Sequence, residues 1–300
     1  MNRRLFSSLR ALRNHDNPLG LPKAGKSPGP NFVNRMQRGL PERRKIQNVK
    51  HVVAISSAKG GVGKSTIAAN LALALARKGH RTGILDTDLY GPSIPTLFNL
   101  ADAGDPDLDK DGRLIPLPSS GVQTMSMGYL TPPGAAVVWR GPMLQKAIQQ
   151  LLHSVAWSPL DVLFLDLPPG TGDIQLTITQ QIHLAGSVIV TTPQKLALED
   201  AAKGVEMFNK SGVRVLGLVS NMSRFACPGC GGVHRLFGSE EGIKAMCEKQ
   251  ELAMLGDVPL DVGMGEESPS ILANPHGPAA SELSAIADNI VGLLGLGDAR

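Results

Sequence analysis

Short apolar runs alternate with longer amphipathic stretches from Val49 almost to the end of the chain. The short runs are rich in β-branched residues and are apolar throughout, which predicts strands that are buried on both faces. The longer stretches repeat their apolar residues at helical spacing, which predicts helices packed against those strands. The alternation predicts an α/β fold over residues 45–296, with a mostly parallel, doubly wound sheet and helices on both of its faces.

The bounds of the elements follow from where each pattern starts and stops. The predicted strands are 49–56, 82–86, 121–126, 162–166, 187–191 and 213–221, with a short one near 254–256. The predicted helices are 64–78, 93–100, 142–155, 174–183, 197–209, 240–248 and 280–294.

Residues 1–44 do not share this pattern. The first 15 residues hold four arginines and no acid, and Leu5, Leu9 and Leu12 would share one face of a helix. Such an amphipathic, Arg-rich segment is typical of a mitochondrial transit peptide, and a disordered basic N-terminus is the alternative. Residues 14–44 are rich in Pro, Gly and charge, and they predict a linker with one short helix at 31–38.

The charge of the chain is unevenly spread. Residues 1–50 contain 12 Lys/Arg and two acids, or +10, which leaves 18 bases and 24 acids, or −6, for residues 51–300. The basic balance therefore belongs to the N-terminal tail, and the folded part gives no support for a nucleic-acid surface. No apolar run is long enough for a transmembrane segment, and no 7–15-residue apolar stretch follows the first charges as in a secretory signal.

A glycine-rich segment joins the first predicted strand to the first predicted helix. Residues 58–65 read AKGGVGKS and match the P-loop pattern G-x-x-x-x-G-K-[ST] except at Ala58. Its glycines let backbone N–H groups turn towards phosphate oxygens, and the helix that follows adds its N-terminal dipole. Lys64 can reach the β- and γ-phosphates, and Ser65 can bind Mg²⁺. The predicted ATP-binding residues of this segment are Lys59, Gly60, Gly61, Val62, Gly63, Lys64, Ser65 and Thr66.

Polar residues also end three other predicted strands. Asp86 and Asp88 lie at the end of strand 82–86, Asp166 ends strand 162–166, and Asn221 ends strand 213–221. Carboxylates at the carboxyl ends of parallel strands can face bound phosphates and position water or Mg²⁺. Asp166 has the place of a Walker B acid that holds Mg²⁺. Asn221 can equally be a nucleotide contact or a turn residue.

The three cysteines are too few for a disulfide framework in a chain of this length. Cys227 and Cys230 form a Cys-x-x-Cys turn that can aim two sulfurs at one point, whereas zinc or an iron–sulfur cluster takes four thiolates. A homodimer would supply four on its two-fold axis. A zinc site with His234 as an added ligand, a redox dithiol and two unrelated cysteines are the alternatives. Cys247 falls in a predicted helix and is expected to be a small buried hydrophobe.

Eight segments occur along the chain in this order: SSAKGGVGKST, LDTDLYGPSIP, VVWRGPM, LDLPPGTGD, TTPQ, NMS, CPGC and LFGSEEG. Together they resemble the deviant-Walker P-loop ATPases, a family that includes nitrogenase iron protein, the septum-site and partition ATPases and the Mrp/NBP-type iron–sulfur carriers. Among the carriers, the chain is most similar to the mitochondrial NUBPL type, which is required for assembly of NADH dehydrogenase (complex I).

The resemblance implies a role for each predicted residue. Lys59 would reach the nucleotide of the partner subunit in a homodimer, Asp88 would orient the attacking water, and both would act with Lys64 as the catalytic residues. Asn221 would read the adenine edge, and residues 166–173 would form a switch loop. Cys227 and Cys230 would hold a labile [4Fe–4S] cluster between two subunits.

The same resemblance implies a function: a slow ATPase in the mitochondrial matrix that carries the cluster to apo-proteins, with complex I subunits as the expected recipients. The alternative is a septum-site or partition-type positioning ATPase with a structural zinc or an unmetallated cysteine pair. Against it, the stretch 285–300 has only one basic residue, so it lacks the cationic face of a membrane-binding helix. A reductase like nitrogenase iron protein would use two well-separated cysteines and is disfavoured.

Overall fold

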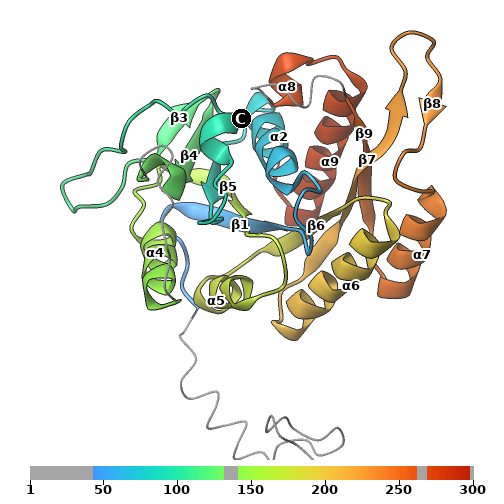
Figure 1. Ribbon diagram of the computed structural model, residues 1–300. Coiled ribbons are helices and arrows are strands. Elements are labelled where there is room, and N and C mark those ends of the chain that lie inside the picture. Colours follow the sequence, from blue (N-terminus) through green and yellow to red (C-terminus); the bar gives the residue numbers. More distant parts are fainter. Residues whose placement is uncertain (1–42, 132–140, 262–268, 298–300) are drawn as a thin grey trace, which may run out of the picture. The chain divides into compact units, whose positions relative to one another are not determined.

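The computed structural model describes residues 43–131, 141–261 and 269–297, all of which belong to one compact unit (Figure 1). The predicted transit peptide and most of the linker, including helix 31–38, lie outside these residues. The first described residues are hydrogen-bonded to distant parts of the same unit. The Arg43 guanidinium donates to the Ser211 carbonyl oxygen at 2.5 Å, and the Arg44 N–H donates to the Gln181 carbonyl oxygen at 2.8 Å.

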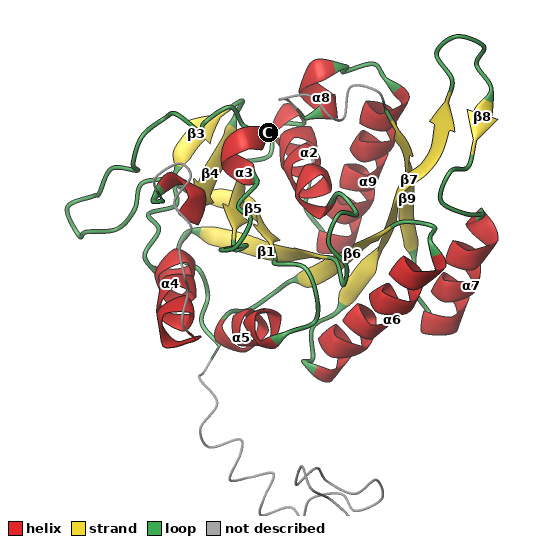
Figure 2. Cartoon of the chain, in the orientation of Figure 1, coloured by secondary structure: helices red, strands yellow, loops and turns green. Residues whose placement is uncertain are grey.

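A nine-stranded sheet runs through the described part of the unit (Figure 2). Its order is β3-β4-β2-β5-β1-β6-β7-β8, and β9 also pairs with β7. The β3–β4 and β7–β8 pairs are antiparallel and the other pairs are parallel, so the predicted mostly parallel sheet is confirmed. The strands are β1 (Val49–Ser56), β2 (Thr82–Asp86), β3 (Leu117–Ser119), β4 (Val122–Ser126), β5 (Leu160–Asp166), β6 (Gly186–Thr191), β7 (Val215–Ala226), β8 (Val233–His234) and β9 (Met254–Leu260).

Helices cover both faces of this sheet, as predicted. Alternate residues of β1 enter different cores: Val53 and Ile55 pack with α2, α3, α8 and α9, whereas Val52 and Ala54 pack with α4, α5, α6 and α7. The helices are α2 (Lys64–Arg77), α3 (Ile94–Leu97), α4 (Gly141–His153), α5 (Asp173–Gln181), α6 (Lys195–Lys210), α7 (Glu240–Gln250), α8 (Ser270–Ala273) and α9 (Pro278–Leu294), with a 3₁₀ turn at Met127–Tyr129. Among the described residues, no helix is long and apolar enough to cross a bilayer.

The strand order brings three loops together at one edge of the sheet. β5 lies between β1 and β2, and its last residue, Asp166, pairs with the last residue of β2, Asp86, and with the next-to-last residue of β1, Ile55. The loops that follow β1, β2 and β5 therefore start side by side, at the carboxyl edge where ligands bind in open α/β sheets.

Candidate nucleotide site and cysteine hairpin

The turn between β1 and α2 has the backbone of a phosphate-binding loop. Gly61 and Gly63 have φ angles of +78° and +82°, in the left-handed region that favours glycine. A Cβ on Gly63 would lie 2.3 Å from the Nδ2 atom of Asn221, so the loop packs too closely there for any side chain. α2 begins at Lys64 without a side-chain cap, which leaves its first N–H groups open to an anion.

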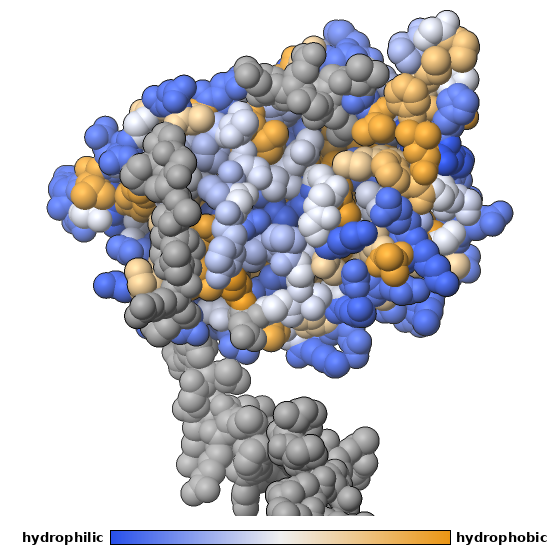
Figure 3. Space-filling model, in the orientation of Figure 1, coloured by the Kyte–Doolittle hydropathy of each residue, from blue (hydrophilic) through white to orange (hydrophobic). Residues whose placement is uncertain are grey.

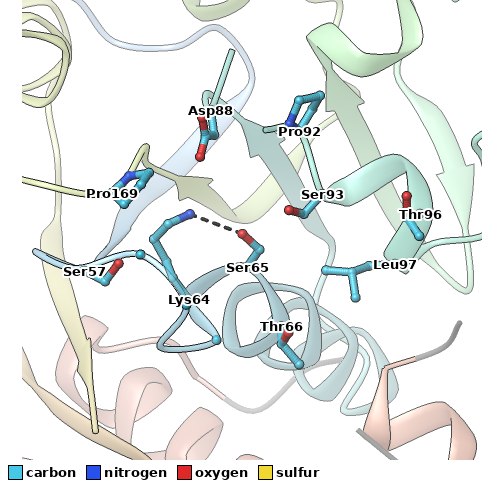
Figure 4. Close-up of a pocket in the computed structure, with 13 residues that line it drawn as sticks. Ser57, Lys64, Ser65, Thr66, Asp88, Pro92, Ser93, Thr96, Leu97 and Pro169 are labelled. Atoms are coloured by element: carbon cyan, nitrogen blue, oxygen red, sulfur yellow. Dashed lines mark hydrogen bonds between the residues drawn. The ribbon is translucent and has the colours of Figure 1, made fainter. Parts of the chain in front are cut away.

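A cavity of about 460 Å³ adjoins this turn (Figure 4). Asp88 and Pro169, from the loops after β2 and β5, face Lys64 and Ser65 across it. The predicted ATP-binding residues that line it are Gly60, Gly61, Gly63, Lys64, Ser65 and Thr66. The cavity therefore has the position, and the backbone N–H and lysine donors, that the phosphates of a nucleoside triphosphate need.

The lysine of the P-loop and the acid at the end of β5 meet beside the cavity. Lys64 Nζ pairs with Asp166 Oδ1 and lies 3.2 Å from the Ser65 Oγ. Asp166 is fully buried, and its Oδ2 has no partner among the described residues. Burial raises the pKa of Asp166, and Lys64 and Ser65 oppose that shift. A buried carboxylate oxygen without a partner, close to a serine hydroxyl, fits the ligand set of Mg²⁺ in a P-loop site.

Asp86 has a structural role that the sequence did not reveal. Its buried carboxylate accepts hydrogen bonds from the backbone N–H groups of Asp88, Ser93 and Ile94 and from the Ser126 hydroxyl, at 3.0 to 3.2 Å. These bonds fix the loop that carries Asp88 to the cavity. Burial, together with the nearby charge of Asp166, raises the pKa of Asp86 to about 7. An acid at a buried strand end, two residues before another acid, was the only signal for this role in the sequence.

Gln175 is a second residue that the sequence did not single out. Its Nε2 donates to the Pro168 carbonyl oxygen at 2.6 Å, and its Oε1 accepts from the Ser56 hydroxyl at 3.2 Å. The Gly170 N–H also donates to the Ser57 carbonyl oxygen at 2.9 Å. The loop after β5 is thus tied to the end of β1, so a change at one can displace the other.

Four predicted nucleotide residues, Lys59, Val62, Asp166 and Asn221, do not line the cavity. Asn221 is buried, and its Nδ2 donates to the Val62 carbonyl oxygen at 2.9 Å, so it holds the P-loop from the side. Its Oδ1 has no partner within the described residues. Lys59 is half-buried, with no ionic partner for its side chain in the part of the chain that the structure describes. The roles that the resemblance implied for Lys59 and Asn221 stay predictions.

Cys227 and Cys230 lie at the tip of the β7–β8 hairpin. The Cys227 N–H donates to the Gly232 carbonyl oxygen at 2.9 Å, and the Gly231 N–H donates to the Cys227 carbonyl oxygen at 2.8 Å. Cys227 is half-buried and Cys230 is exposed. The predicted loop is therefore a hydrogen-bonded turn with Cys230 exposed at its tip. Val233 in β8 and Leu236, two residues after β8, are exposed apolar residues, and Figure 3 shows hydrophobic colour over the β7–β8 hairpin.

The chemistry of the turn suits metal binding by thiolates. Backbone N–H groups of Cys230 and Gly229 lower the pKa of the Cys227 thiol, which favours the thiolate that metals bind. No group of three potential metal ligands occurs within the described residues, so the pair alone does not complete a four-ligand site. Cys247 is buried in α7, where burial raises its pKa, and the expectation of a small buried hydrophobe is confirmed.

Known proteins of similar sequence and structure agree with this geometry. The family model described as ParA, NUBPL iron-transfer P-loop NTPase, matches residues 48–291. An iron-sulfur cluster carrier protein of Pseudomonas fragi is 49% identical over 239 residues, which cover 78% of this chain and 83% of that protein. The iron-sulfur cluster transfer protein NUBPL of Mus musculus is 47% identical over 262 residues, which cover 85% of this chain and 81% of that protein.

A solved structure extends the similarity to three dimensions. The nucleotide-binding protein of Archaeoglobus fulgidus, in complex with ADP, superposes with a TM-score of 0.64 at 34% identity and covers 80% of this chain and 89% of its own. The predicted P-loop NTPase fold is thereby confirmed.

Proposed function

This chain belongs to the NUBPL iron-transfer family of P-loop NTPases, and we propose that it carries a [4Fe–4S] cluster whose retention is controlled by ATP. The observation that carries the proposal is the pair of accessible thiols at the tip of a hairpin whose first strand also holds the P-loop. Membership of the family gives nucleotide binding and iron–sulfur transfer. The cluster type, the dimer, the recipients and the location are our proposals.

The cavity supports binding of ATP with Mg²⁺. Lys64 would exchange its bond to Asp166 for the phosphates, and Ser65 and Asp166 would hold the metal, which neutralises phosphate charge. Asp88 faces the cavity and would orient a water that attacks the γ-phosphorus. The bond to the β–γ bridging oxygen then breaks, and ADP and phosphate leave. We propose that this hydrolysis is slow, because a carrier needs a switch rather than a high flux.

Two copies of the chain would complete the cluster site. Each hairpin supplies two thiolates, and a [4Fe–4S] cluster takes four. Val233 and Leu236, which follow the cysteines in sequence, are 60% and 58% exposed, and we propose that a second copy covers these apolar side chains. The side chain of Lys59 is outside the cavity lining of its own chain, which supports a role at the nucleotide of the partner.

β7 offers a route by which nucleotide could affect the cluster. Asn221 bonds the P-loop carbonyl of Val62, and Cys227 follows the end of the same strand. Between them the pairing with β9 is irregular, and Met222 has a φ of +54°. We propose that ATP and ADP favour different positions of this segment, so that each state holds the cluster differently.

The recipients and the location rest on sequence alone. The N-terminal segment resembles a transit peptide, which supports the mitochondrial matrix. We propose apo-proteins of that compartment as recipients, with subunits of respiratory complex I as the expected ones, because the sequence motifs resemble those of the carrier type required for complex I assembly.

The test is iron and acid-labile sulfide analysis of the anaerobically reconstituted protein, beside a Cys227→Ala/Cys230→Ala variant. We expect about four iron and four sulfide per dimer, and loss of both in the variant. The Cys247→Ala variant is the matched control and should load as the wild type does, because that thiol is buried away from the hairpin in α7. Zinc alone, or no metal, would refute the carrier function and leave a switch ATPase with a structural cysteine pair.

A further inference from the structure

The two sulfurs of the hairpin have different surroundings. The sulfur of Cys227 accepts hydrogen bonds from the backbone N–H groups of Gly229 and Cys230. Cys230 is more exposed, and its side chain is a hydrogen-bond partner of the Cys227 sulfur. A further donor for this sulfur can come from a side chain of the adjoining strand β8.

His234 is the side chain of β8 that could supply this donor. Its strand β8 returns along β7, with His234 opposite Phe225. A Cβ on Gly232 would lie 3.3 Å from the Cys230 Sγ and 3.4 Å from the His234 Nε2. The sulfur and the ring nitrogen thus border the same small space, which stays open because residue 232 is glycine.

The neighbouring cations are engaged elsewhere. The Arg235 guanidinium donates to the Glu240 carboxylate at 2.5 Å, and Lys244 approaches the same carboxylate at 3.4 Å. Glu240 lies in the first turn of α7, so both charges are paired with the start of that helix. His234 is the polar residue of β8, and its Nε2 borders the same space as the Cys230 sulfur.

We infer that His234 positions the cargo cluster by donating its Nε2–H to the sulfur of Cys230, without being a ligand itself. The inference rests on the proposed carrier function. Hydrogen bonds to cluster sulfurs set the reduction potential and stabilise the charge of the ligated thiolate. His234 would donate a hydrogen bond to the thiolate of Cys230, as the backbone N–H groups do to the thiolate of Cys227. Both thiolates of the turn would then be stabilised as ligands of the cluster.

Three variants test this role. His234→Leu keeps the size of the side chain but removes the donor, whereas His234→Gln keeps an N–H donor. Arg235→Gln changes the adjacent residue and is the matched control. Each is reconstituted anaerobically beside the wild type, and iron and sulfide content, the reduction potential and the rate of iron loss to a ferrous chelator are measured. Unchanged ATP affinity shows that the variants fold.

We expect His234→Leu to load a cluster that has a more negative potential and loses iron about tenfold faster, the range seen when a residue bonded to a metal ligand is removed. His234→Gln should restore most of the difference, and Arg235→Gln should match the wild type. Equal potentials and equal loss rates in His234→Leu and wild type would overturn the inference, as would a His234→Leu variant that binds no iron, which would make His234 a ligand. If the wild type itself loads no iron and sulfide, the proposed carrier function is wrong. The wild-type measurement therefore distinguishes failure of the carrier function from failure of the role of His234.

Discussion

The tightest packing in the nucleotide site is between single residues of the P-loop and β7. Gly63 has a φ of +82°, and any Cβ there would collide with the Asn221 amide that bonds the Val62 carbonyl oxygen. A glycine here thus serves two needs at once, a left-handed backbone and close approach of a neighbour. The result is a P-loop whose shape is fixed before nucleotide binds.

We expect Gly63→Ala to destabilise that loop. The left-handed alanine costs about 1–2 kcal/mol, and loss of the Asn221 hydrogen bond adds about 1 kcal/mol. The unfolding temperature without nucleotide should fall, and calorimetry should show ATP affinity lower by at least about tenfold, the equivalent of 1.4 kcal/mol. Gly60→Ala is the control, because no atom lies within 4 Å of its Cβ position. Equal unfolding temperatures for the two variants would contradict the argument.

Asp86 gives a prediction for pH. Its pKa in the fold is raised from 3.8 to about 7, so between these values the native state binds a proton that the unfolded state has lost. Stability therefore falls as pH rises through this window, by up to about 1.4 kcal/mol per pH unit. Chemical denaturation of the nucleotide-free protein from pH 5 to 8 measures the slope. Asp86→Asn should be less stable at pH 5 and should have a flatter slope; an unchanged slope would show that Asp86 is ionised throughout.

At the scale of elements, β7 connects the two sites. It starts inside the sheet, and beyond Asn221 its pairing with β9 is broken until Phe225. After this break, Arg224 forms ion pairs with Asp257 on β9 and, at 3.1 Å, with Glu282 on α9, which connect β7 to both elements. The irregular segment is therefore held at both ends, one at the P-loop and one below the cysteine hairpin.

Met222→Gly should weaken the link between the two sites. Glycine adopts the φ of +54° without strain and removes a side chain whose Cε lies 3.6 Å from the Cβ position of Gly63. We expect ATP affinity and iron content to stay close to the wild type, while the ratio of iron-loss rates with and without ATP moves towards one. Ser120→Gly relieves a φ of +49° in the β3–β4 turn and is the control. The coupling role is wrong if the ratio is the same in both variants.

The sequence predicted elements where the apolar pattern was long and regular. β1 and β2 have their predicted bounds, and α2 ends one residue early. Three short elements were missed. β3 contains Pro118 at a sheet edge, β8 has two residues after a glycine pair, and α8 has four residues, so none has room for a period. β7 runs to Ala226 rather than 221 because pairing with β8 extends it, a contact that local pattern does not encode.

The candidate site also has residues that the sequence predicted and residues that it did not. Lys64, Ser65 and Asp166 belong to patterns with a known spacing, and the structure brings them together. Gln175 belongs to no such pattern. Its role is a bridge between the ends of two strands that are far apart in sequence, and only the sheet order creates it.

At the scale of the whole molecule, the proposed dimer would split each ATP site between two chains. Asp88 would act on the nucleotide of its own chain, because it lines that cavity, and Lys59 on that of the partner. Lys59→Ala and Asp88→Asn should each abolish hydrolysis in a pure dimer. Neither change removes Lys64 or the P-loop glycines, so both variants should still bind ADP.

Mixing the two variants separates action in trans from action in cis. In a mixed dimer, the Lys59→Ala chain keeps Asp88 and receives Lys59 from its partner, so one of the two sites is whole. With random exchange about half of the dimers are mixed, and we expect about a quarter of wild-type hydrolysis from two inactive proteins. If Lys59 served its own chain, every site would lack one of the two residues and mixing would restore nothing. The same mixing experiment with Cys227→Ala/Cys230→Ala added to both chains tests whether the cluster is needed to hold the dimer together. If mixing still restores hydrolysis, ATP is sufficient to hold the two chains together.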